Sequence, residues 1–372
     1  MAGARRLKVV QILPALDSGG VERGTLEVAR ALVSAGHTSY VISAGGRLVD
    51  SLQREGTVHV TLPVRNKSPR AFLAVRQLRR WLLENPVDIL HARSRLPAWI
   101  AWKALQGIPE DRRPHFITTC HGAHSVNRYS AIMARGDRVI AVSEFIRHYL
   151  VDNYGLRESE ITLIPRGVDS GEFPYAYRPS GEWLDRWQAE YPQLQHAPVL
   201  TLAGRLTRLK GHDAFIRLVG QLNDAGTEVY GLIVGGEDPK RIPYANEIKQ
   251  LASEIAGDKV IFTGMRSDIR EIYAVSDIVF SLSNKPESFG RTVLEAVKLG
   301  RPVVAYDHGG VSEILRTTFP QGLVPLHDDQ TLQLKTREIL ASHPTVPQTG
   351  EFERSDMLEQ TLNLYQETCA RG

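Results

Sequence analysis

Residues 7–46 have the sequence LKVVQILPALDSGGVERGTLEVARALVSAGHTSYVISAGG. An apolar run at the start leads into a glycine turn, a helical stretch extends from Glu22 to Gly36, and a second apolar run ends at Gly46. Continuous apolar strands that alternate with amphipathic helices are typical of a parallel sheet covered on both faces. We therefore predict that the chain begins as a doubly wound α/β domain.

The same alternation recurs along the chain. Further short apolar stretches end in polar or glycine residues, which is where a doubly wound sheet builds its site. These stretches are VDILHAR, HFITTCHG, RVIAVS and ITLIPRGV before residue 173, and VLTLAGR, VYGLIVGG, KVIFTG, DIVFSLS and RPVVAYD after residue 198. The fold class is therefore α/β, with two Rossmann-like domains.

The proposed boundaries follow from the places where this pattern stops. Residues 174–197 are rich in proline and aromatic residues and lack a strand pattern, so we predict a connector that carries one helix. The first domain would span residues 1–173 and the second residues 198–349. Residues 350–372 would form a C-terminal helix that packs back on the first domain.

Length and composition exclude several classes of protein. At 372 residues the chain is too long for one ordinary core, and 42% hydrophobic with 23% charged residues is a soluble globular composition. Only Cys120 and Cys369 occur, which argues against a disulfide framework. No apolar run reaches the ~18 residues of a membrane span, and the basic start lacks the apolar core of a signal peptide. We expect a cytoplasmic location.

Charge is unevenly distributed. Residues 1–172 hold 24 Lys and Arg against 16 Asp and Glu, whereas the remainder holds 21 against 26. Within Arg65–Arg80 six basic residues alternate with apolar ones and no acid occurs, which predicts an amphipathic basic helix suited to an anionic membrane surface. A solvated helix face is the alternative. Because no recognised nucleic-acid module accompanies this charge, we expect no nucleic-acid partner.

The first strand-to-helix turn contains Gly19 and Gly20. Paired glycines let a ligand approach the backbone, and the helix that follows offers free N–H groups to an anion. The turn is not a G-x-G-x-x-G sequence, and no acid for a ribose hydroxyl follows the second strand, so a nicotinamide site is disfavoured. A merely tight turn remains the alternative.

The second domain begins with a comparable loop, Gly204–His212. Arg205 and Lys210 lie five residues apart on it, and two such cations can close on a diphosphate from both sides. Arg208 is a second choice for the role of Arg205. A solvent-exposed basic loop is the alternative.

A second strand-to-helix turn in this domain carries two glutamates eight residues apart, Glu287 and Glu295. Glu287 would lie in the loop, while Gly290 and Thr292 would offer first-turn N–H groups to a phosphate or sugar oxygen. Glu295, about one turn into the helix, could accept hydrogen bonds from ribose hydroxyls. Such a pair alone is common by chance.

Taken together, these landmarks resemble the GT-B glycosyltransferases of the large retaining family 4 over nearly the whole chain. The landmarks in the family's order are Gly19–Arg23, Thr119–Gly122, Val142–Glu144, Ile164–Asp169, Gly204-Arg205 with Lys210-Gly211, Glu287 with Glu295, and Gly309-Gly310 with Glu313. The N-terminal part is similar to bacterial enzymes that extend lipopolysaccharide core or other cell-envelope glycans. The resemblance implies two domains facing across a cleft.

The resemblance also implies roles for individual residues. Arg205 and Lys210 would neutralise the donor diphosphate, Glu287 would bind donor-sugar hydroxyls, and His121 would lie beside the reacting sugar. The remaining donor-binding residues would be Gly19, Gly20, Met265, Arg266, Ser288, Phe289, Gly290, Thr292 and Glu295. At Arg166, an acceptor-side candidate, the sequence departs from the family, which often has Asn there. His91, at the end of another apolar strand, is a second acceptor-side candidate.

Two histidines also have structural interpretations. His121 follows an apolar strand, at the edge of the sheet where ligands bind, although a lone strand-end histidine is more often structural. His91 ends another strand and is an acceptor-side or a structural residue. Cys120 points to the opposite face from His121, which argues against a nucleophilic pair.

The chemistry expected from these residues is transfer of a sugar from a nucleotide-diphosphate donor to a glycan or lipid-linked acceptor. UDP is the first choice of nucleotide, with GDP and ADP open. No D-x-D sequence occurs, so we expect no metal and no cofactor. Alternatives are a nucleotide-sugar epimerase or hydrolase on the same fold, and a noncatalytic sugar-nucleotide-binding subunit. The acceptor would place the protein at the inner face of the cytoplasmic membrane.

Overall fold

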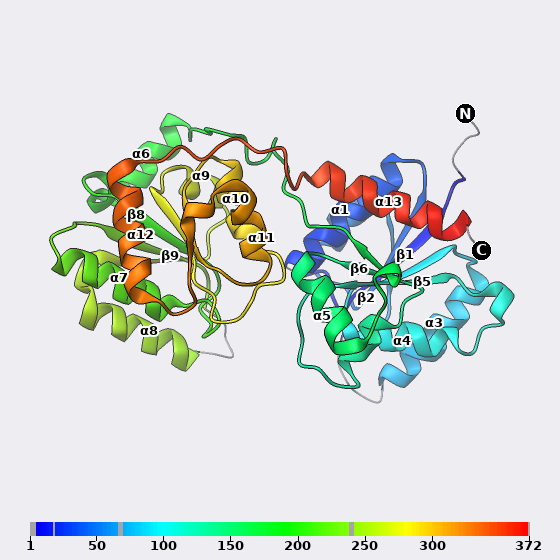
Figure 1. Ribbon diagram of the computed structural model, residues 1–372. Coiled ribbons are helices and arrows are strands. Elements are labelled where there is room, and N and C mark those ends of the chain that lie inside the picture. The colour runs from blue at the N-terminus through cyan, green and yellow to red at the C-terminus, as the bar shows by residue number, and fades with distance from the viewer. Residues whose placement is uncertain (1–4, 18, 66–69, 238–241, 371–372) are drawn as a thin grey trace. The chain divides into compact units, whose positions relative to one another are not determined.

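The computed structural model describes residues 5–17, 19–65, 70–237 and 242–370. The chain divides into two compact units (Figure 1). Unit 1 comprises residues 1–165 with 354–372, and unit 2 comprises residues 166–353.

Unit 1 is built on a parallel sheet of seven strands in the order β3-β2-β1-β4-β5-β6-β7. Its strands are β1 (Lys8–Ile12), β2 (Thr38–Ser43), β3 (Val58–Thr61), β4 (Ile89–Ala92), β5 (His115–Cys120), β6 (Arg138–Ala141) and β7 (Ile161–Leu163). Its α-helices are α1 (Gly20–Ser34), α2 (Val49–Arg54), α3 (Arg70–Glu84), α4 (Arg95–Leu105), α5 (Glu144–Tyr154) and α13 (Arg354–Ala370).

Unit 2 is built on a parallel sheet of six strands in the order β10-β9-β8-β11-β12-β13. Its strands are β8 (Val199–Ala203), β9 (Tyr230–Val234), β10 (Val260–Gly264), β11 (Ile278–Ser281), β12 (Val303–Tyr306) and β13 (Leu323–Val324). Its α-helices are α6 (Gly181–Glu190), α7 (His212–Asp224), α8 (Ile242–Ile255), α9 (Ile269–Ala274), α10 (Arg291–Lys298), α11 (Gly309–Thr318) and α12 (Asp329–Ser342).

These two sheets confirm the predicted α/β class. The sequence pattern missed only the short strands β3 and β13. Strand order reverses direction between β1 and β4 in unit 1 and between β8 and β11 in unit 2. In open parallel sheets, ligands bind beyond the carboxyl ends of the strands at such switch points. Each unit therefore has one position favoured for a ligand.

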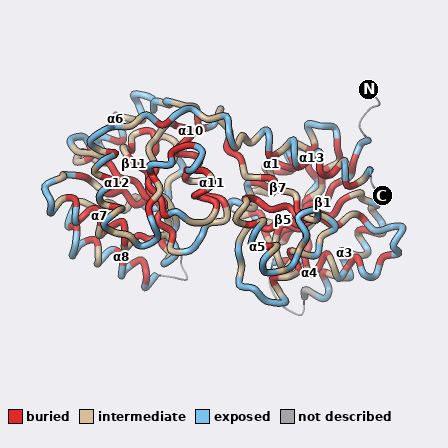
Figure 2. Tube along the Cα trace, in the orientation of Figure 1, coloured by how far each residue is buried: buried red, intermediate tan, exposed pale blue. Residues whose placement is uncertain are grey.

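In unit 1, α1 and α13 pack side by side on one face of the sheet (Figure 1). Their apolar side chains, including Leu32 and Leu364, form a buried cluster with Val9 and Ile89 from the strands. Figure 2 shows the strands as the most completely buried part of the unit. The last helix thus belongs to the core of unit 1, although it follows the whole of unit 2 in the chain.

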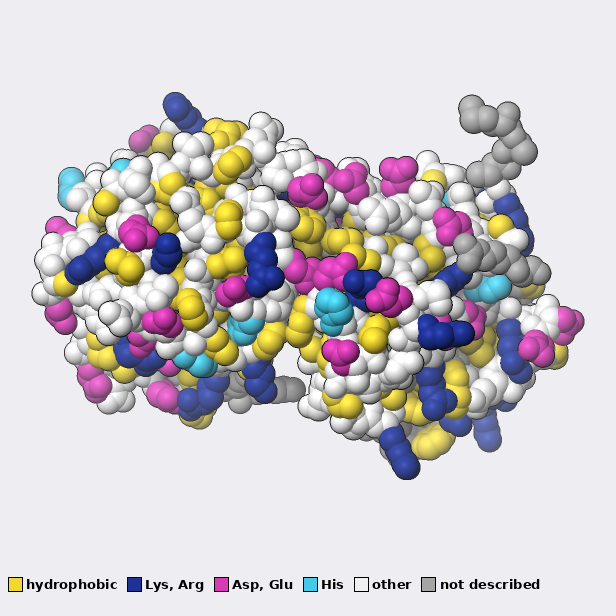
Figure 3. Space-filling view, viewed as in Figure 1, with side chains coloured by type: hydrophobic (Ala, Val, Ile, Leu, Met, Phe, Trp, Pro, Cys, Tyr) yellow, Lys and Arg dark blue, Asp and Glu magenta, His cyan; other side chains and the backbone are white. Residues whose placement is uncertain are grey.

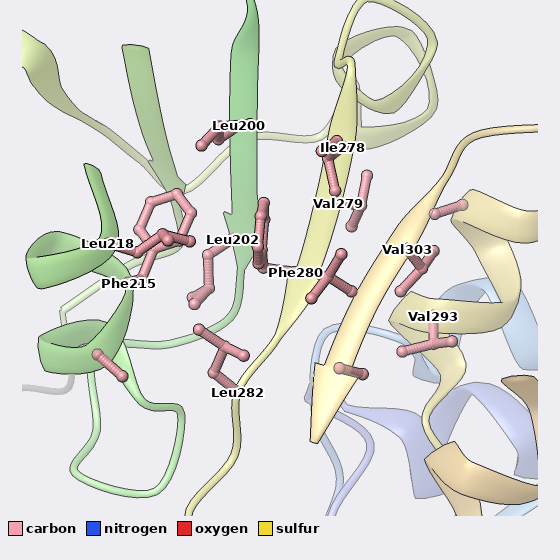
Figure 4. Packing of buried hydrophobic residues seen from close by; sticks show 14 of the residues in the cluster. Leu200, Leu202, Phe215, Leu218, Ile278, Val279, Phe280, Leu282, Val293 and Val303 are labelled. Carbon is pink, nitrogen blue, oxygen red and sulfur yellow. The ribbon is translucent and has the colours of Figure 1, made fainter. Parts of the chain in front are cut away.

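In unit 2, α7 packs on β8 and β11 (Figure 4). The ring of Phe215 from α7 meets Phe280 from β11 with a centroid distance of 5.4 Å and an interplanar angle of 60°. Leu200 and Leu202, two residues apart on β8, join the same cluster. Full burial of one such side chain contributes roughly 1.5–3 kcal/mol, so this layer holds the strand ends in place.

Residues 174–197 contain one α-helix, α6, and a short 3-10 helix over Pro192–Gln195, but they are not a separate connector. Trp183 and Trp187 of α6 stack with a centroid distance of 5.0 Å and are buried against Val199 and Ile272 of unit 2. The change from unit 1 to unit 2 comes earlier, between Pro165 and Arg166. The aromatic residues that obscured any strand pattern are therefore core residues of unit 2.

Candidate functional site

The loop that follows β8 in unit 2 is held against the strand beside it. Gly211, at the start of α7, has φ +70, and a Cβ on it would lie 1.9 Å from the carbonyl oxygen of Leu282. A Cβ on Gly235 would lie 1.9 Å from the carbonyl oxygen of Gly204. Both positions require glycine because a side chain would force the loop away from its neighbours. The loop ends are therefore fixed.

The three cations of this loop differ in their surroundings. Arg208 forms two hydrogen bonds with Glu247, and its guanidinium carbon lies 4.9 Å from the centroid of the Tyr244 ring. Arg205 is exposed and has no hydrogen bond or ion pair with any residue that the structure describes. The side chain of Arg205 is therefore available to a ligand, whereas that of Arg208 is engaged with Glu247.

Lys210 meets the loop that follows β11. Its Nζ donates to Oε1 of Glu287 at 2.7 Å, and the same oxygen accepts a hydrogen bond from the hydroxyl of Ser283 at 2.5 Å. Burial alone would raise the pKa of Glu287, but the charge of Lys210, its hydrogen bond and that of Ser283 lower the pKa below its usual value. The carboxylate is therefore ionised near neutral pH, and both side chains keep partial exposure to solvent.

The Glu287 loop is also packed closely. Gly290 caps α10 with φ +101, and no side chain caps this helix. A Cβ on Gly310 would lie 2.5 Å from the Cα of Phe289, and the N–H of Gly310 donates to the carbonyl of Glu287 at 2.8 Å. The first-turn N–H groups of a helix have no intrahelical partner, so the backbone here can bind an oxygen ligand.

Side chains of the same loop face different surroundings. Phe289 is buried and packs edge-to-face on Phe352 at a centroid distance of 5.6 Å. Ser288 and Thr292 remain half-buried. The side chain of Phe289 thus anchors the turn, which leaves the backbone as the part that is suited to a ligand.

Glu295 lies deeper than its proposed contact with a ribose suggests. It is 5% exposed, and its Oε1 accepts from Nε of Arg291 at 3.0 Å. Tyr273 is fully buried nearby, and its hydroxyl has no hydrogen-bond partner among the described residues. Burial raises the pKa of Tyr273, and the charges of Glu295 and Glu287 raise it further.

Met265 and Arg266, predicted to line a nucleobase pocket with their main chain, follow β10. Met265 is 79% exposed. The side chain of Arg266 is engaged within unit 2, with two hydrogen bonds to Asp268 at 2.8 and 2.9 Å and further bonds to Glu190. Only the backbone of Arg266 is left for a base.

In unit 1, Gly19 and Gly20 form the start of α1. Gly19 has φ +149, and a Cβ on it would lie 2.5 Å from Oε2 of Glu22. Among the residues that the structure describes, a Cβ on Gly20 would have no atom within 4 Å, and no side chain caps the helix. Among the described residues, the turn therefore leaves open space beside Gly20 at the start of α1.

His121 directly follows β5 and is half-buried. Its neighbour Cys120 is buried, and burial raises the pKa of the thiol to about 11. Cys120 donates to the carbonyl of Gly122 at 3.5 Å and belongs to an apolar cluster. Cys120 is therefore a core residue and is not ionised at neutral pH. Arg166 is half-buried at the start of unit 2.

His91 lies in the interior of unit 1. It is fully buried, with Nδ1 2.7 Å from the hydroxyl of Tyr365 and Nε2 2.6 Å from the hydroxyl of Thr119. Both ring nitrogens are occupied within unit 1. The structural interpretation of His91 is therefore favoured, because contact with an acceptor substrate would need a ring nitrogen that faces solvent.

Lys210 and Glu287 thus meet at the switch point of unit 2, and Arg205 and Gly290 lie on the same two loops; in unit 1, Gly20 begins α1 and His121 follows the end of β5. Sequence reasoning missed Ser283, Tyr273 and His308. His308 donates from Nε2 to the carbonyl of Ser283 at 2.8 Å, which braces the Glu287 loop. Among the described residues no His, Cys, Asp and Glu side chains form a group that could hold a metal ion.

Comparisons with known proteins identify the family. The model of Glycosyltransferase Family 4 matches residues 18–172, and that of Glycosyl transferases group 1 matches residues 185–355. The chain belongs to glycosyltransferase family 4. The two matched segments of this family 4 chain correspond closely to the two units.

Solved structures show the same fold. A glycosyltransferase from Rickettsia africae ESF-5 is 30% identical with a TM-score of 0.85, and the match covers 97% of this family 4 chain and 98% of that one. Anabaena Alr3699/HepE, solved in complex with UDP and glucose, is 19% identical with a TM-score of 0.78, over 97% and 100% of the two chains. The fold is GT-B.

Curated relatives match a smaller part of the chain. D-inositol 3-phosphate glycosyltransferase of Nocardia farcinica is 30% identical over 190 residues, which are 50% of this chain and 41% of the relative. This family 4 chain spans about half the length of the curated relatives that it matches.

Proposed function

We propose that the protein is a retaining glycosyltransferase that moves a sugar from a nucleotide-diphosphate donor, with UDP as the first choice, to a hydroxyl of a cell-envelope glycan or lipid-linked acceptor. Lipopolysaccharide core is the first choice of acceptor. The observation that carries this proposal is the meeting of Lys210 and Glu287 at the switch point of unit 2, with the exposed Arg205 on the same loop as Lys210.

In this proposal the diphosphate is the leaving group. Negative charge grows on its oxygen as the bond to the anomeric carbon breaks, and preorganised donors at such an oxygen are worth ~2.7–4 kcal/mol of barrier each. Lys210 and Arg205 supply positive charge at this position, and first-turn N–H groups of α10 supply hydrogen bonds. No divalent ion is needed for this role.

Retention of configuration follows from attack on the face that the leaving group vacates. The acceptor oxygen bonds to the anomeric carbon on that face, and its proton passes to the departing phosphate oxygen. Glu287, held ionised by Lys210, accepts hydrogen bonds from donor-sugar hydroxyls. Family resemblance assigns His121 to the reacting sugar and Glu295 to the ribose.

The test incubates the protein with UDP-, GDP- and ADP-sugars, with and without deacylated lipopolysaccharide core, and analyses products by mass spectrometry and NMR. Transfer with the donor's anomeric configuration supports the proposal. Free or rearranged sugar formed at the same rate without acceptor indicates a hydrolase or epimerase. Binding of nucleotide without any turnover indicates a noncatalytic subunit.

We also propose that unit 1 attaches to an anionic membrane surface through α3. Ala74, Leu78 and Leu82 of this helix face the core, whereas Phe72 and Leu73 are 80% and 54% exposed. Figure 3 shows Lys and Arg side chains, with hydrophobic ones between them, over the part of unit 1 where α3 and α4 lie. Among the described residues no helix is both long and apolar enough to cross a bilayer.

Not all six basic side chains within residues 65–80 are available to a membrane surface. Arg79 donates to the backbone carbonyls of Ala104 and Lys103, and Arg65 pairs with Asp17 at 3.2 Å. Lys67 lies outside the described residues. Arg76 and Arg80 are exposed and remain available for anionic headgroups.

Flotation with vesicles of phosphatidylglycerol and phosphatidylethanolamine tests this attachment. We expect salt-sensitive binding that the double variant Arg76→Glu and Arg80→Glu loses, while Arg186→Glu, a control on an exposed residue of unit 2, retains it. Equal recovery with uncharged vesicles would refute the attachment and leave the proposed transfer untouched.

A further inference from the structure

A buried polar bridge joins the last helix of unit 1 to the strand that precedes His121. Tyr365 of α13, His91 of β4 and Thr119 of β5 are 0%, 0% and 3% exposed. The hydroxyl of Tyr365 lies 2.7 Å from Nδ1 of His91, and Nε2 of His91 lies 2.6 Å from the hydroxyl of Thr119. The rings of Tyr365 and His91 meet edge-to-face at a centroid distance of 5.8 Å.

This bridge lies within an otherwise apolar layer. Tyr365 packs with Val9, Ile89, Ile117 and Leu364 in the cluster beneath α1 and α13. A buried polar group in such a layer lowers the stability of the fold unless it is hydrogen-bonded. Apolar groups of the same shape can replace a hydrogen-bonded pair with little loss of stability. The stability of the fold alone therefore does not explain why three polar side chains lie here. A need to fix the positions of these residues would explain it.

The bridge lies on the face of the sheet that carries this cluster. Successive side chains of a strand alternate between faces, so Thr119 shares a face of β5 with Ile117, and His91 shares a face of β4 with Ile89. His121 and Arg93 follow the ends of these two strands, two residues beyond Thr119 and His91.

Arg93 is 3% exposed and donates to Oε1 of Gln11 at 2.9 Å, while Nε2 of Gln11 donates to the carbonyl of Thr25 in α1 at 3.0 Å. A second set of buried polar contacts thus lies at the end of β4, and burial raises the pKa of Tyr365 while the charge of Arg93 lowers it. Together with the bridge these contacts form a buried polar layer near the strand ends.

Neutral imidazole fits this layer. A second cation two residues from the buried guanidinium of Arg93 would be unfavourable, and a neutral ring has one donor and one acceptor nitrogen. In the neutral tautomer protonated at Nε2, Tyr365 donates to Nδ1 and the N–H at Nε2 donates to Thr119, and in the other tautomer both directions are reversed.

We propose that Tyr365 is a positioning residue for His121, acting through His91 and Thr119 to fix the end of β5. This inference rests on the proposed function, because it concerns the role of His121 in that reaction. The last helix of the chain then takes part in catalysis without touching a substrate. It does so by holding a strand end whose displacement by about 1 Å can slow a reaction by roughly a hundredfold.

The test compares Tyr365→Phe, which deletes one hydroxyl, with the control Thr368→Val. Thr368 lies in the same helix, is also buried, and bonds only to the carbonyl of Leu364 at 2.7 Å. We expect Tyr365→Phe to lower kcat roughly tenfold with donor KM and nucleotide affinity unchanged, and Thr368→Val to leave all three unchanged. An unchanged kcat in a folded Tyr365→Phe protein would overturn the inference.

A second readout does not depend on activity. Nitrogen-15 NMR of the imidazole rings should show one fixed neutral tautomer of His91 in the wild type, and Tyr365→Phe should alter both the His91 and the His121 signals. If Tyr365→Phe does not fold, Thr119→Val removes the other end of the bridge and should shift the His121 signals. Unchanged His121 signals would overturn the positioning role. Absence of any transfer by the wild type, together with altered His121 signals in Tyr365→Phe, would refute the proposed function and its catalytic role for His121, and would leave the positioning of His121 by Tyr365 supported.

Discussion

Lys210 and Glu287 lie 77 residues apart in the chain, yet their Nζ and Oε1 atoms are 2.7 Å apart. They meet because one follows β8 and the other follows β11, and these strands are neighbours at the point where strand order reverses. An ammonium group that already balances a carboxylate can share its charge with a phosphate when a donor binds. The ion pair is thus a preorganised part of the proposed donor site.

Removal of either available cation should slow transfer. We expect Arg205→Ala and Lys210→Ala each to reduce kcat about a hundredfold at saturating donor, because each removes charge stabilisation from the leaving diphosphate. Initial rates of UDP release measure this effect. Arg208→Ala is the control, since its exposed pair with Glu247 is worth little, and its kcat should stay within about threefold of wild type. Turnover unchanged in both test variants would refute the roles of Arg205 and Lys210.

Lys210→Met should change the titration of Glu287. In the wild type the pKa of Glu287 is lowered, so the ion pair contributes stability above the usual value of 4.5, and this stability is lost as the pH falls through the folded pKa. Without Lys210 the effect of burial, which raises the pKa, remains, and the pKa should rise above its wild-type value. Carbon-13 NMR of the Glu287 carboxyl group measures its pKa in the wild type and in Lys210→Met. Arg208→Met should leave the pKa unchanged, and a value that stays low in Lys210→Met would show that Lys210 is not its cause.

Replacement of the glycine at the start of α7 should lower the free energy of unfolding more than replacement of the glycine after its end. Gly211 and Gly226 have φ +70 and +79, but only at Gly211 would a Cβ meet backbone, at 1.9 Å from the carbonyl oxygen of Leu282. We expect Gly211→Ala to lower the free energy of unfolding by about 3 kcal/mol and Gly226→Ala by about 1 kcal/mol. Urea unfolding measures the difference, and equal losses would contradict close packing of the loop.

His212 should make the stability of unit 2 depend on pH. Burial, with the charge of Lys210, lowers the pKa of His212 from 6.5 to about 4. Between these values the unfolded state binds a proton that the folded state does not, so stability should fall by about 3 kcal/mol as the pH drops from 6.5 to about 4, and no further below that.

The measurement is the free energy of unfolding from pH 7 to pH 4. His212→Gln should lose this contribution, whereas His196→Gln, a control on an exposed histidine of the same unit, should keep it. A wild-type protein and a His212→Gln variant with the same pH dependence would show that His212 does not titrate in this way.

Local pattern was enough to predict both parallel sheets and the loops that carry Arg205, Lys210 and Glu287. Apolar runs, glycines and helix starts are properties of short segments, and sheet topology then brings strand ends together. The helix over Arg354–Ala370 was also predicted from its own residues.

Contacts between distant segments could not be predicted in this way. The burial of His91 depends on Tyr365, 274 residues later in the chain, and the engagement of Arg266 depends on Glu190, 76 residues earlier. The proline and aromatic residues of 174–197 resembled a connector because no local pattern shows that Trp183 and Trp187 pack on unit 2. These outcomes depend on tertiary packing, to which a single segment gives no signal.

The most direct test of the central claim is a crystal structure of the protein with UDP or a UDP-sugar bound. We predict that the diphosphate lies at the carboxyl ends of β8 and β11, within hydrogen-bond distance of Lys210 Nζ and of the Arg205 guanidinium. A well-ordered diphosphate bound elsewhere, with no contact to either side chain, would contradict the account.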